Sequence, residues 1–286
     1  MKNKTVLVTG DRGTIGKVLV PLLQLQGFDV VGSKRPSEST NVEYRQIELI
    51  PFAAIESPNL VAIINLSGLY SVDSDPETLD RMFESNCGLA VSIANLAKEL
   101  RIPVIQAGTF FEFAPVELLP WSAYSITKLA ASDILKESAS RNGIGFMELV
   151  LFDNYGGNPS RKKFIDQLIE LASVEKPLEA TEGLQVQDLT HINDVCEAFV
   201  TALNFMIENP DFVGVRQVRS KEVLSLREIV ALFNRQSPTQ LKVDWGSRTY
   251  RHREVFEIWD CAPNLENWSP KRKLAEYFSE LNQSNS

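Results

Sequence analysis

The chain has 286 residues, of which 44% are hydrophobic, enough to bury one large core and a smaller lobe. Its 37 acidic side chains outnumber its 29 basic ones, and the net charge of −8 argues against a nucleic-acid scaffold with a basic stripe. No apolar run approaches the length of a membrane span, and three widely spaced cysteines without metal-ligand spacing favour a reducing, cytoplasmic setting and no metal site.

An apolar run at 5–9, predicted to be a strand, passes directly into three glycines spaced by two residues each. This spacing is typical of a dinucleotide-binding turn, because glycine permits both the sharp turn and a close approach of backbone to pyrophosphate. The helix predicted over 14–26 would present free N–H groups and a partial positive charge to the phosphates. An ordinary strand-turn-helix is the alternative. We expect the cofactor to contact Gly10, Arg12, Gly13, Thr14, Ile15 and Gly16.

The second predicted strand, at 29–32, is followed by Ser33, Lys34 and Arg35. A fold that selects NAD usually places a carboxylate here for the ribose 2′-hydroxyl, whereas a hydroxyl and two cations suit a 2′-phosphate. This favours NADP(H) over NAD(H), with Arg12 closing on the same phosphate. A solvated loop is the alternative.

Further apolar runs alternate with amphipathic stretches through the first half of the chain. The expected strands lie near 61–66, 103–107 and 145–152, and the expected helices near 77–99, 122–140 and 160–174. Strand alternating with helix predicts an α/β fold, a doubly wound parallel sheet of the Rossmann type covered on both faces.

The second half is richer in loops, with helices expected at 225–235 and 270–282. We interpret it as a smaller substrate lobe that is interleaved in sequence with the last elements of the main sheet. The dinucleotide-binding domain is expected to span 1–155 plus about 186–208. The substrate-binding lobe is expected to span about 156–185 plus 209–286.

Tyr124 and Lys128 are four residues apart on a predicted helix, so they share one face. A neighbouring ammonium favours the phenolate and lowers the tyrosine pKa, making the phenol a usable acid and base near neutrality. Such a pair occurs by accident on many helices. Its position after the glycine turn favours a catalytic role.

At these residues the chain resembles the short-chain dehydrogenase/reductase superfamily, in its extended branch, the NAD-dependent epimerases and dehydratases of nucleotide sugars. Further segments resemble the family in the expected order: 63–68, 84–86, 104–109, 152–156 and 187–195. The resemblance implies catalytic roles for Thr109, Tyr124 and Lys128. It also implies a homodimer, formed by helices like those at 77–99 and 122–140. Finally, it adds the following cofactor-binding candidates: Glu48, Leu49, Leu66, Ser67, Gly68, Asn86, Tyr124, Lys128 and Phe152.

The sequence departs from the family at three places: Ala107-Gly108 replaces the usual Ser-Ser, Asp153 the usual Asn, and Gln187 the usual Arg. Dehydratases carry a carboxylate pair directly after the catalytic Thr, where this chain has Phe110-Phe111. A 4-epimerase retains NAD, whereas the cation cluster favours a reductase that uses NADPH.

The chain is most similar to the 4-ketoreductases that complete nucleotide-linked deoxysugars, such as the synthases of CDP-linked abequose and paratose. The expected reaction reduces the 4-keto group of a nucleoside-diphosphate 6-deoxy or 3,6-dideoxy hexose. An epimerase of the same family, a reductase of a non-sugar carbonyl and a non-catalytic NADP(H) sensor are the alternatives. We expect the substrate to contact Thr109, Phe110, Asp153, Asn154, Arg161, Lys162, Lys163, Arg251 and Arg253.

Overall fold

The computed structural model describes residues 4–32, 59–73, 75–115, 122–157, 159, 161–174, 176–238, 240–251 and 254–284. The chain divides into two compact units, each formed from three segments. The first comprises Met1–Leu151, Cys196–Val218 and Cys261–Trp268. The second comprises Phe152–Val195, Arg219–Asp260 and Ser269–Ser286. Among the described helices, none combines the length and the apolar character needed to cross a bilayer.

The first unit is built on a six-stranded parallel sheet, which confirms the predicted α/β fold. Its strands follow the order β2-β1-β3-β4-β5-β9. Every residue of β1 and β5 is buried, which explains why these strands are continuous apolar runs. The bounds are Asp29–Gly32 for β2, Thr5–Thr9 for β1, Leu60–Asn65 for β3, Val104–Thr109 for β4, Phe146–Leu151 for β5 and Val213–Val218 for β9.

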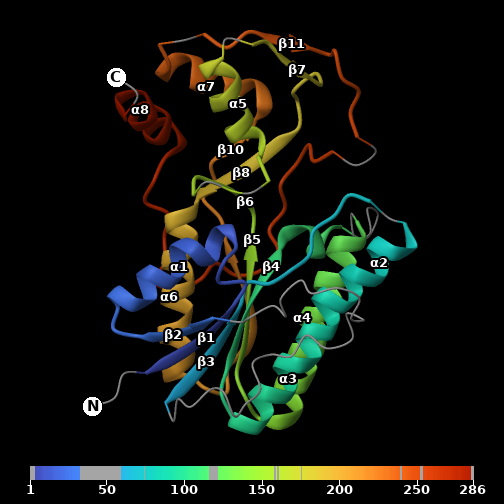
Figure 1. Cartoon of the computed structure of the whole chain (residues 1–286), viewed down its shortest axis with the longest axis vertical. Helices are drawn as coiled ribbons and strands as arrows, with labels where there is room; N and C mark the ends of the chain where they lie inside the picture. The colour runs from blue at the N-terminus through green and yellow to red at the C-terminus, as the bar shows by residue number, and fades with distance from the viewer. Residues whose placement is uncertain are drawn as a thin grey trace, which may run out of the picture. The chain divides into compact units, whose positions relative to one another are not determined.

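Helices cover both faces of this sheet (Figure 1). On one face lie α1 (Thr14–Leu25) and α6 (Ile192–Glu208), and on the other lie α3 (Leu89–Leu100) and α4 (Ala123–Asn142). The side chains between the sheet and the α3–α4 face form a dry apolar core. It includes Leu7, Ile63, Ile93, Leu135 and Phe146, each no more than 2% exposed.

The amphipathic stretch expected at 77–99 is not one regular helix. It forms α2 (Pro76–Phe83), a π-helical turn η2 (Glu84–Gly88) and then α3. Wide turns of this kind are rare in helices and are often found at functional sites. A shorter 3₁₀ segment, η3 (Phe110–Phe113), follows β4. Both irregular segments contain candidate site residues, Asn86 in η2 and Phe110 in η3.

The described residues of the second unit form two small sheets and the helices α5, α7 and α8. One sheet has the order β10-β8-β6, and the other pairs β11 with β7. Its core packs the helices together, with the rings of Phe233 and Phe278 in edge contact at 5.1 Å. The bounds are Asp153–Tyr155 for β6, Phe164–Ser173 for α5, Leu178–Ala180 for β7, Val186–His191 for β8, Val223–Ser225 for β10, Leu226–Gln236 for α7, Val243–Trp245 for β11 and Leu274–Ser284 for α8.

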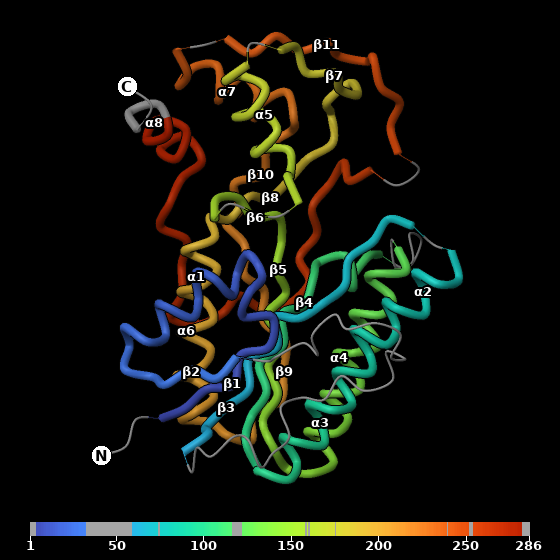
Figure 2. The backbone as a smooth tube through the Cα atoms, in the orientation of Figure 1, coloured from blue at the N-terminus to red at the C-terminus, as the bar shows by residue number. Residues whose placement is uncertain are grey.

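Strand β9 lies in a stretch expected in the small lobe, yet it pairs with β5 in the main sheet from Phe146↔Val213 to Leu151↔Val218. The two strands are far apart in the sequence and lie side by side (Figure 2). The buried side chain of Gln217 then binds Asn264 at 3.0 Å and the backbone N–H of Cys261 at 3.0 Å. These bonds attach 261–268 to the first unit.

We predict that Gly16→Ala destabilises the fold. A Cβ on Gly16 would lie 2.4 Å from the carbonyl oxygen of Gly10 and 2.5 Å from that of Asp11, so α1 would have to move. Overpacking of this kind costs about 1–3 kcal/mol, measured as the change in the urea-unfolding free energy.

Gly88→Ala is the matched control, because Gly88 has a helical φ of −59° and a Cβ there would meet no atom within 4 Å. It should stabilise the protein by about 0.5–1 kcal/mol. Equal effects of the two substitutions would contradict this account of the glycine turn.

Candidate functional site

The glycine turn is compact enough to exclude side chains. Gly10 has a φ of +71°, and its carbonyl accepts a hydrogen bond from the N–H of Gly13 at 2.9 Å. A Cβ on Gly10 would lie 2.9 Å from backbone atoms of Leu66 and Ser67, and one on Gly13 would lie 3.1 Å from the Gly10 carbonyl. Gly13 caps α1 without a side chain. A backbone cradle at a helix amino terminus fits the pyrophosphate of a dinucleotide.

The carboxylate of Asp11 lies at the carboxyl end of β2. A Cβ on Gly32 would be 2.3 Å from Asp11 Oδ2, so a larger residue here would displace the Asp11 side chain. In dinucleotide-binding folds this strand end faces the adenosine ribose. Arg12 is exposed. The cofactor candidates Ser33, Lys34, Arg35, Glu48 and Leu49 lie outside the described residues.

A ladder of buried polar side chains orders the loop after β3. Thr9 Oγ1 donates to Asn65 Oδ1, and Asn65 Nδ2 donates to Gln106 Oε1 at 2.6 Å. The N–H of Ser67 donates to Asn65 Oδ1 at 3.2 Å, and the N–H of Leu66 donates to the Thr9 carbonyl at 3.1 Å. The candidate residues Leu66 and Ser67 are therefore held against the glycine turn.

Asn86 fixes the next part of that loop from the π-helical turn η2. Its Oδ1 accepts from the N–H of Leu69 at 2.7 Å, and its Nδ2 donates to the Leu69 carbonyl at 3.2 Å. Nδ2 also donates to Thr127 Oγ1 at 2.8 Å, and Thr127 Oγ1 donates to the Tyr124 carbonyl at 2.9 Å. One buried amide thus joins the loop after β3 to the amino-terminal turns of α4.

Tyr124 and Lys128 meet at Gly68. A Cβ on Gly68 would lie 3.7 Å from Lys128 Cδ and from Asn86 Oδ1, and 3.9 Å from Tyr124 Cε2. The Tyr124 ring also makes an edge contact with Tyr70, with centroids 5.0 Å apart. The structure therefore brings together four predicted site residues, Gly68, Asn86, Tyr124 and Lys128.

Lys128 is buried, with 4% of its surface exposed, and its Nζ donates to the Ala107 carbonyl of β4 at 2.6 Å. Burial lowers the pKa of this ammonium, while the neighbouring Glu112 and Glu148 raise it. The predicted catalytic residue Thr109 ends the same strand, two residues beyond Ala107. Its N–H donates to Glu112 Oε1 at 2.7 Å.

The sequence analysis missed Thr127, Glu112 and Glu148, although one signal was available. Glu148 is the one charged residue in the otherwise apolar run 146–152. Its partner Glu112 is five residues beyond Ala107, and nothing in the sequence pattern around it marks it as buried.

The predicted substrate contact Phe110 is 2% exposed, and its ring centroid lies 4.1 Å from that of Phe111. The structure therefore places Phe110 in the interior.

The remaining substrate candidates with described positions belong to the second unit. Lys163 is half-buried, and its Nζ donates to Asn154 Oδ1 at 2.7 Å and to the Asn154 carbonyl at 3.1 Å. Burial raises the pKa of Asp153, and the charges of Lys163 and Arg161 oppose that shift. Lys162 forms an exposed ion pair with Glu170 at 2.5 Å. A cluster of polar and charged groups therefore surrounds Asp153.

Phe152 and Arg251 complete the described candidates of this unit. The guanidinium of Arg219 lies over the Phe152 ring, 4.9 Å from its centroid. Arg251 is exposed, and its backbone N–H donates to Glu254 Oε1 at 3.2 Å. Arg253 lies outside the described residues.

Taken with this geometry, comparison with known proteins defines the class. The sequence model that describes the NAD dependent epimerase/dehydratase family matches residues 6–213 of this chain. The chain belongs to this family, and it is an NAD(P)-dependent enzyme.

Two curated relatives and one solved structure illustrate its place in the family. The chain is 25% identical to CDP-abequose synthase of Salmonella typhimurium, covering 96% of both chains, and 26% identical to CDP-abequose synthase of Yersinia pseudotuberculosis, covering 96% of this chain and 98% of that one. It superposes on UDP-glucuronic acid 4-epimerase from Bacillus cereus, solved with UDP-glucuronic acid and NAD, with a TM-score of 0.77. That match has 20% identity and covers 99% of this chain and 100% of the other, which establishes a shared fold.

We predict that Asn86→Leu frees the loop after β3. Leucine cannot replace the amide bonds to Leu69, and leaving the buried partners unsatisfied costs about 1–3 kcal/mol. Hydrogen exchange of the Leu69 amide should accelerate. Thr127→Val is the control, since it removes one bond of Asn86 but keeps both bonds to Leu69, so that amide should remain protected. Fast exchange in both variants would show that the loop does not depend on Asn86.

Proposed function

We propose that this enzyme reduces the 4-keto group of a nucleoside-diphosphate deoxyhexose with NADPH. The observation that carries the proposal is the convergence of Tyr124, Lys128 and Asn86 on Gly68, beside the glycine turn of the same unit. The two CDP-abequose synthases among the relatives favour a CDP-linked 3,6-dideoxy or 6-deoxy sugar.

In this proposal Tyr124 is the general acid. Its phenol gives a proton to the carbonyl oxygen as that oxygen becomes an alcohol, a step that contributes roughly 10²–10⁴ in rate. Thr109, at the end of β4, donates a hydrogen bond to the same oxygen. Lys128 holds the cofactor ribose and, as a cation on the same face of α4, favours the ionised phenol.

The cofactor supplies the hydride when it is bound. The backbone of Gly10, Gly13 and Gly16 would hold its pyrophosphate, with Thr14 and Ile15 at the helix amino terminus. Leu66, Ser67, Gly68, Asn86 and Phe152 are proposed as further contacts, together with Glu48 and Leu49.

NADPH is favoured over NADH by the cations that follow β2. A 2′-phosphate is held best by charge-assisted hydrogen bonds, which Lys34, Arg35 and Arg12 can supply. The Asp11 carboxylate against Gly32 opposes a second anion at this strand end. NADPH is therefore preferred only if the attraction of the 2′-phosphate to Lys34, Arg35 and Arg12 exceeds its repulsion by the Asp11 carboxylate.

The substrate brings its own pyrophosphate, for which Arg161, Lys162 and Lys163 precede α5 and Arg251 and Arg253 lie later in the second unit. Asp153 and Asn154 are the proposed partners of the sugar hydroxyls.

Epimerisation is the second candidate function, because the superposed Bacillus cereus enzyme is a 4-epimerase with the same fold. An epimerase returns the hydride to the sugar and consumes no cofactor, whereas the reductase consumes one NADPH per product. The presence of both Tyr124 and Lys128 argues against a non-catalytic sensor. Dehydration is not favoured, since Phe110-Phe111 stands where dehydratases carry carboxylates.

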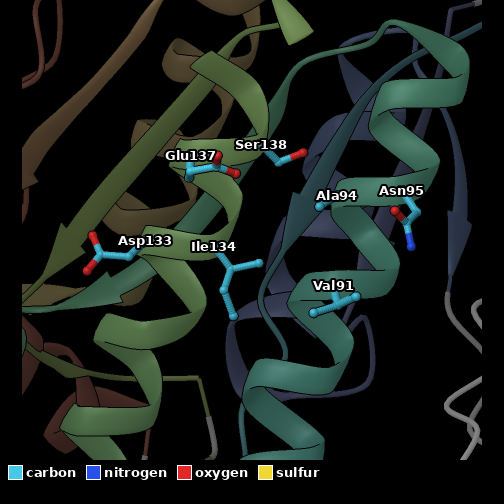
Figure 3. Close-up of a pocket in the computed structure, with 7 residues that line it drawn as sticks. All are labelled: Val91, Ala94, Asn95, Asp133, Ile134, Glu137 and Ser138. Carbon is cyan, nitrogen blue, oxygen red and sulfur yellow. The ribbon is translucent and has the colours of Figure 1, made fainter. Parts of the chain in front are cut away.

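A homodimer is the proposed assembly. Figure 3 shows a hollow at the surface between α3 and α4, to which Val91, Ala94 and Ile134 contribute apolar side chains. Val91 is 47% exposed in the single chain. Packing of these helices against a second copy would bury it. We place the enzyme in the cytoplasm, a location favoured by three cysteines that form no disulfide with one another.

We predict that Tyr124→Phe lowers kcat at least about 100-fold, because the proton donor is lost, while the Kd for NADPH changes little. Activity is measured as NADPH oxidation with CDP-, UDP-, GDP- and dTDP-linked 4-keto-6-deoxyhexoses, and binding by NADPH fluorescence. The control is Tyr250→Phe, in the second unit. A Tyr124→Phe enzyme with normal turnover would refute the assignment, and substrate turnover without net oxidation of NADPH would favour the epimerase.

We also predict that the double variant Lys34→Ala/Arg35→Ala raises the Kd for NADPH at least about tenfold, since each charge-assisted bond is worth about 1.5–3 kcal/mol. The Kd for NADH should stay within about twofold. Both constants come from fluorescence titration, with the exposed Lys17→Ala as control. Unchanged NADPH binding would place the selection of the cofactor elsewhere.

A further inference from the structure

Two carboxyl groups lie inside the first unit behind the candidate catalytic residues. Glu112, from η3, is 6% exposed, and Glu148, from β5, is 3% exposed. The Oε1 atom of Glu148 is buried and has no hydrogen-bond partner among the described residues. Two ionised carboxylates in such a place would repel one another and lack solvation, so the arrangement calls for a proton.

The surrounding contacts connect these carboxyls to the predicted site. Glu112 Oε1 accepts from the N–H of Thr109 at 2.7 Å, and Ser132 Oγ donates to Glu112 Oε2 at 3.4 Å. Ser132 is one helical turn beyond Lys128 on α4 and is itself buried. The carboxyls therefore contact β4 and α4, the two elements that carry Thr109, Tyr124 and Lys128.

Gly108 creates the space for this arrangement. A Cβ on Gly108 would lie 2.2 Å from Glu148 Oε1 and 2.9 Å from Glu148 Cγ and Cδ. No side chain can therefore stand at this position while Glu148 keeps its place. The replacement of the family's usual Ser by Gly108 has a physical reason in this chain: it admits Glu148.

Charge balance fixes the protonation. The buried ammonium of Lys128 compensates one carboxylate and not two, so the cluster is neutral only if the two carboxyls hold one proton between them. Burial raises the pKa of both Glu112 and Glu148. The neighbouring Glu148 carboxylate adds to the rise at Glu112, so the proton belongs to the pair rather than to either carboxyl alone.

We propose that Glu112 and Glu148 share one proton and act as positioning residues, Glu148 as the buried counter-charge of Lys128 and Glu112 as the acceptor that fixes Thr109. Neither residue touches the substrate. The pair keeps Lys128 charged in spite of its burial, and it holds the end of β4 where the hydroxyl of Thr109 is needed. This inference rests on the proposed function for its kinetic consequences alone.

Glutamine substitution tests the pair, because an amide imitates a protonated carboxyl. In Glu112→Gln the amide oxygen can still accept from Thr109 and the amide N–H can still donate to Glu148, so the charge of Lys128 keeps its partner. We expect this variant to retain the wild-type alkaline limb of the kcat–pH profile. Glu112→Leu can neither accept a hydrogen bond from Thr109 nor donate one to Glu148, so this variant should lose activity.

The double variant Glu112→Gln/Glu148→Gln removes the counter-charge. Without a nearby anion the pKa of Lys128 falls, and a neutral Lys128 no longer favours the ionised phenol of Tyr124, so the alkaline limb should shift by about one pH unit or more. Among the described residues Cys87, from η2, Asp133 and Tyr124, both from α4, are further titratable groups near the cluster, and all three remain in every variant. The exposed Glu99→Gln, on α3, is the control and should leave the profile unchanged.

Infrared spectroscopy tests the shared proton without any substrate. The difference spectrum of wild type minus Glu112→Gln at neutral pH should contain the C=O stretch of a protonated carboxyl, and other buried acids cancel in the difference. A missing band, or a double variant with the wild-type alkaline limb, would overturn the inference. If no 4-keto sugar is reduced by the wild type, the proposed function fails, while the infrared result still decides whether the proton is shared.

Discussion

The burial of the Lys128 ammonium is the constraint on which the site depends. A cation this far from water is tolerated only if polar partners and an opposite charge replace its hydration. The Ala107 carbonyl accepts a hydrogen bond from Nζ at 2.6 Å, and the pair formed by Glu112 and Glu148 supplies the opposite charge. These partners come from β4, β5 and η3, so the position of one lysine links the central sheet to α4 and places Tyr124 beside Gly68.

Much of the fold could be predicted from the sequence because buried parallel strands are continuous apolar runs and glycine spacing marks the first turn. The strands at 5–9, 29–32 and 145–152 and the helix at 122–140 agree with β1, β2, β5 and α4 to within a few residues. The role of Asn86 in η2 could not be derived from spacing, since the hydrogen bonds of its side chain depend on where Leu69 and Thr127 lie in space.

The site was predictable where one motif carries both residue type and spacing, as in Tyr124 and Lys128. It was not predictable where contacts depend on strand register. Glu148 is a visible charge in an apolar strand, but its approach to Gly108 follows from the pairing of β4 with β5, and Glu112 joins it through the turn after Thr109. At position 108 the Glu148 carboxyl occupies the space that a side chain would need.

In the proposed function, hydride leaves NADPH and arrives at a sugar carbon beside Tyr124 and the buried Lys128. Incubation of the enzyme with NADPH deuterated at C4 of the nicotinamide, on the transferred face, and a CDP-linked 4-keto-deoxyhexose tests that claim most directly. Mass spectrometry of the product should find one deuterium at C4 of the sugar and one equivalent of NADP⁺. A product that contains no deuterium, or substrate recovered unreduced with every nucleoside diphosphate, would contradict the account.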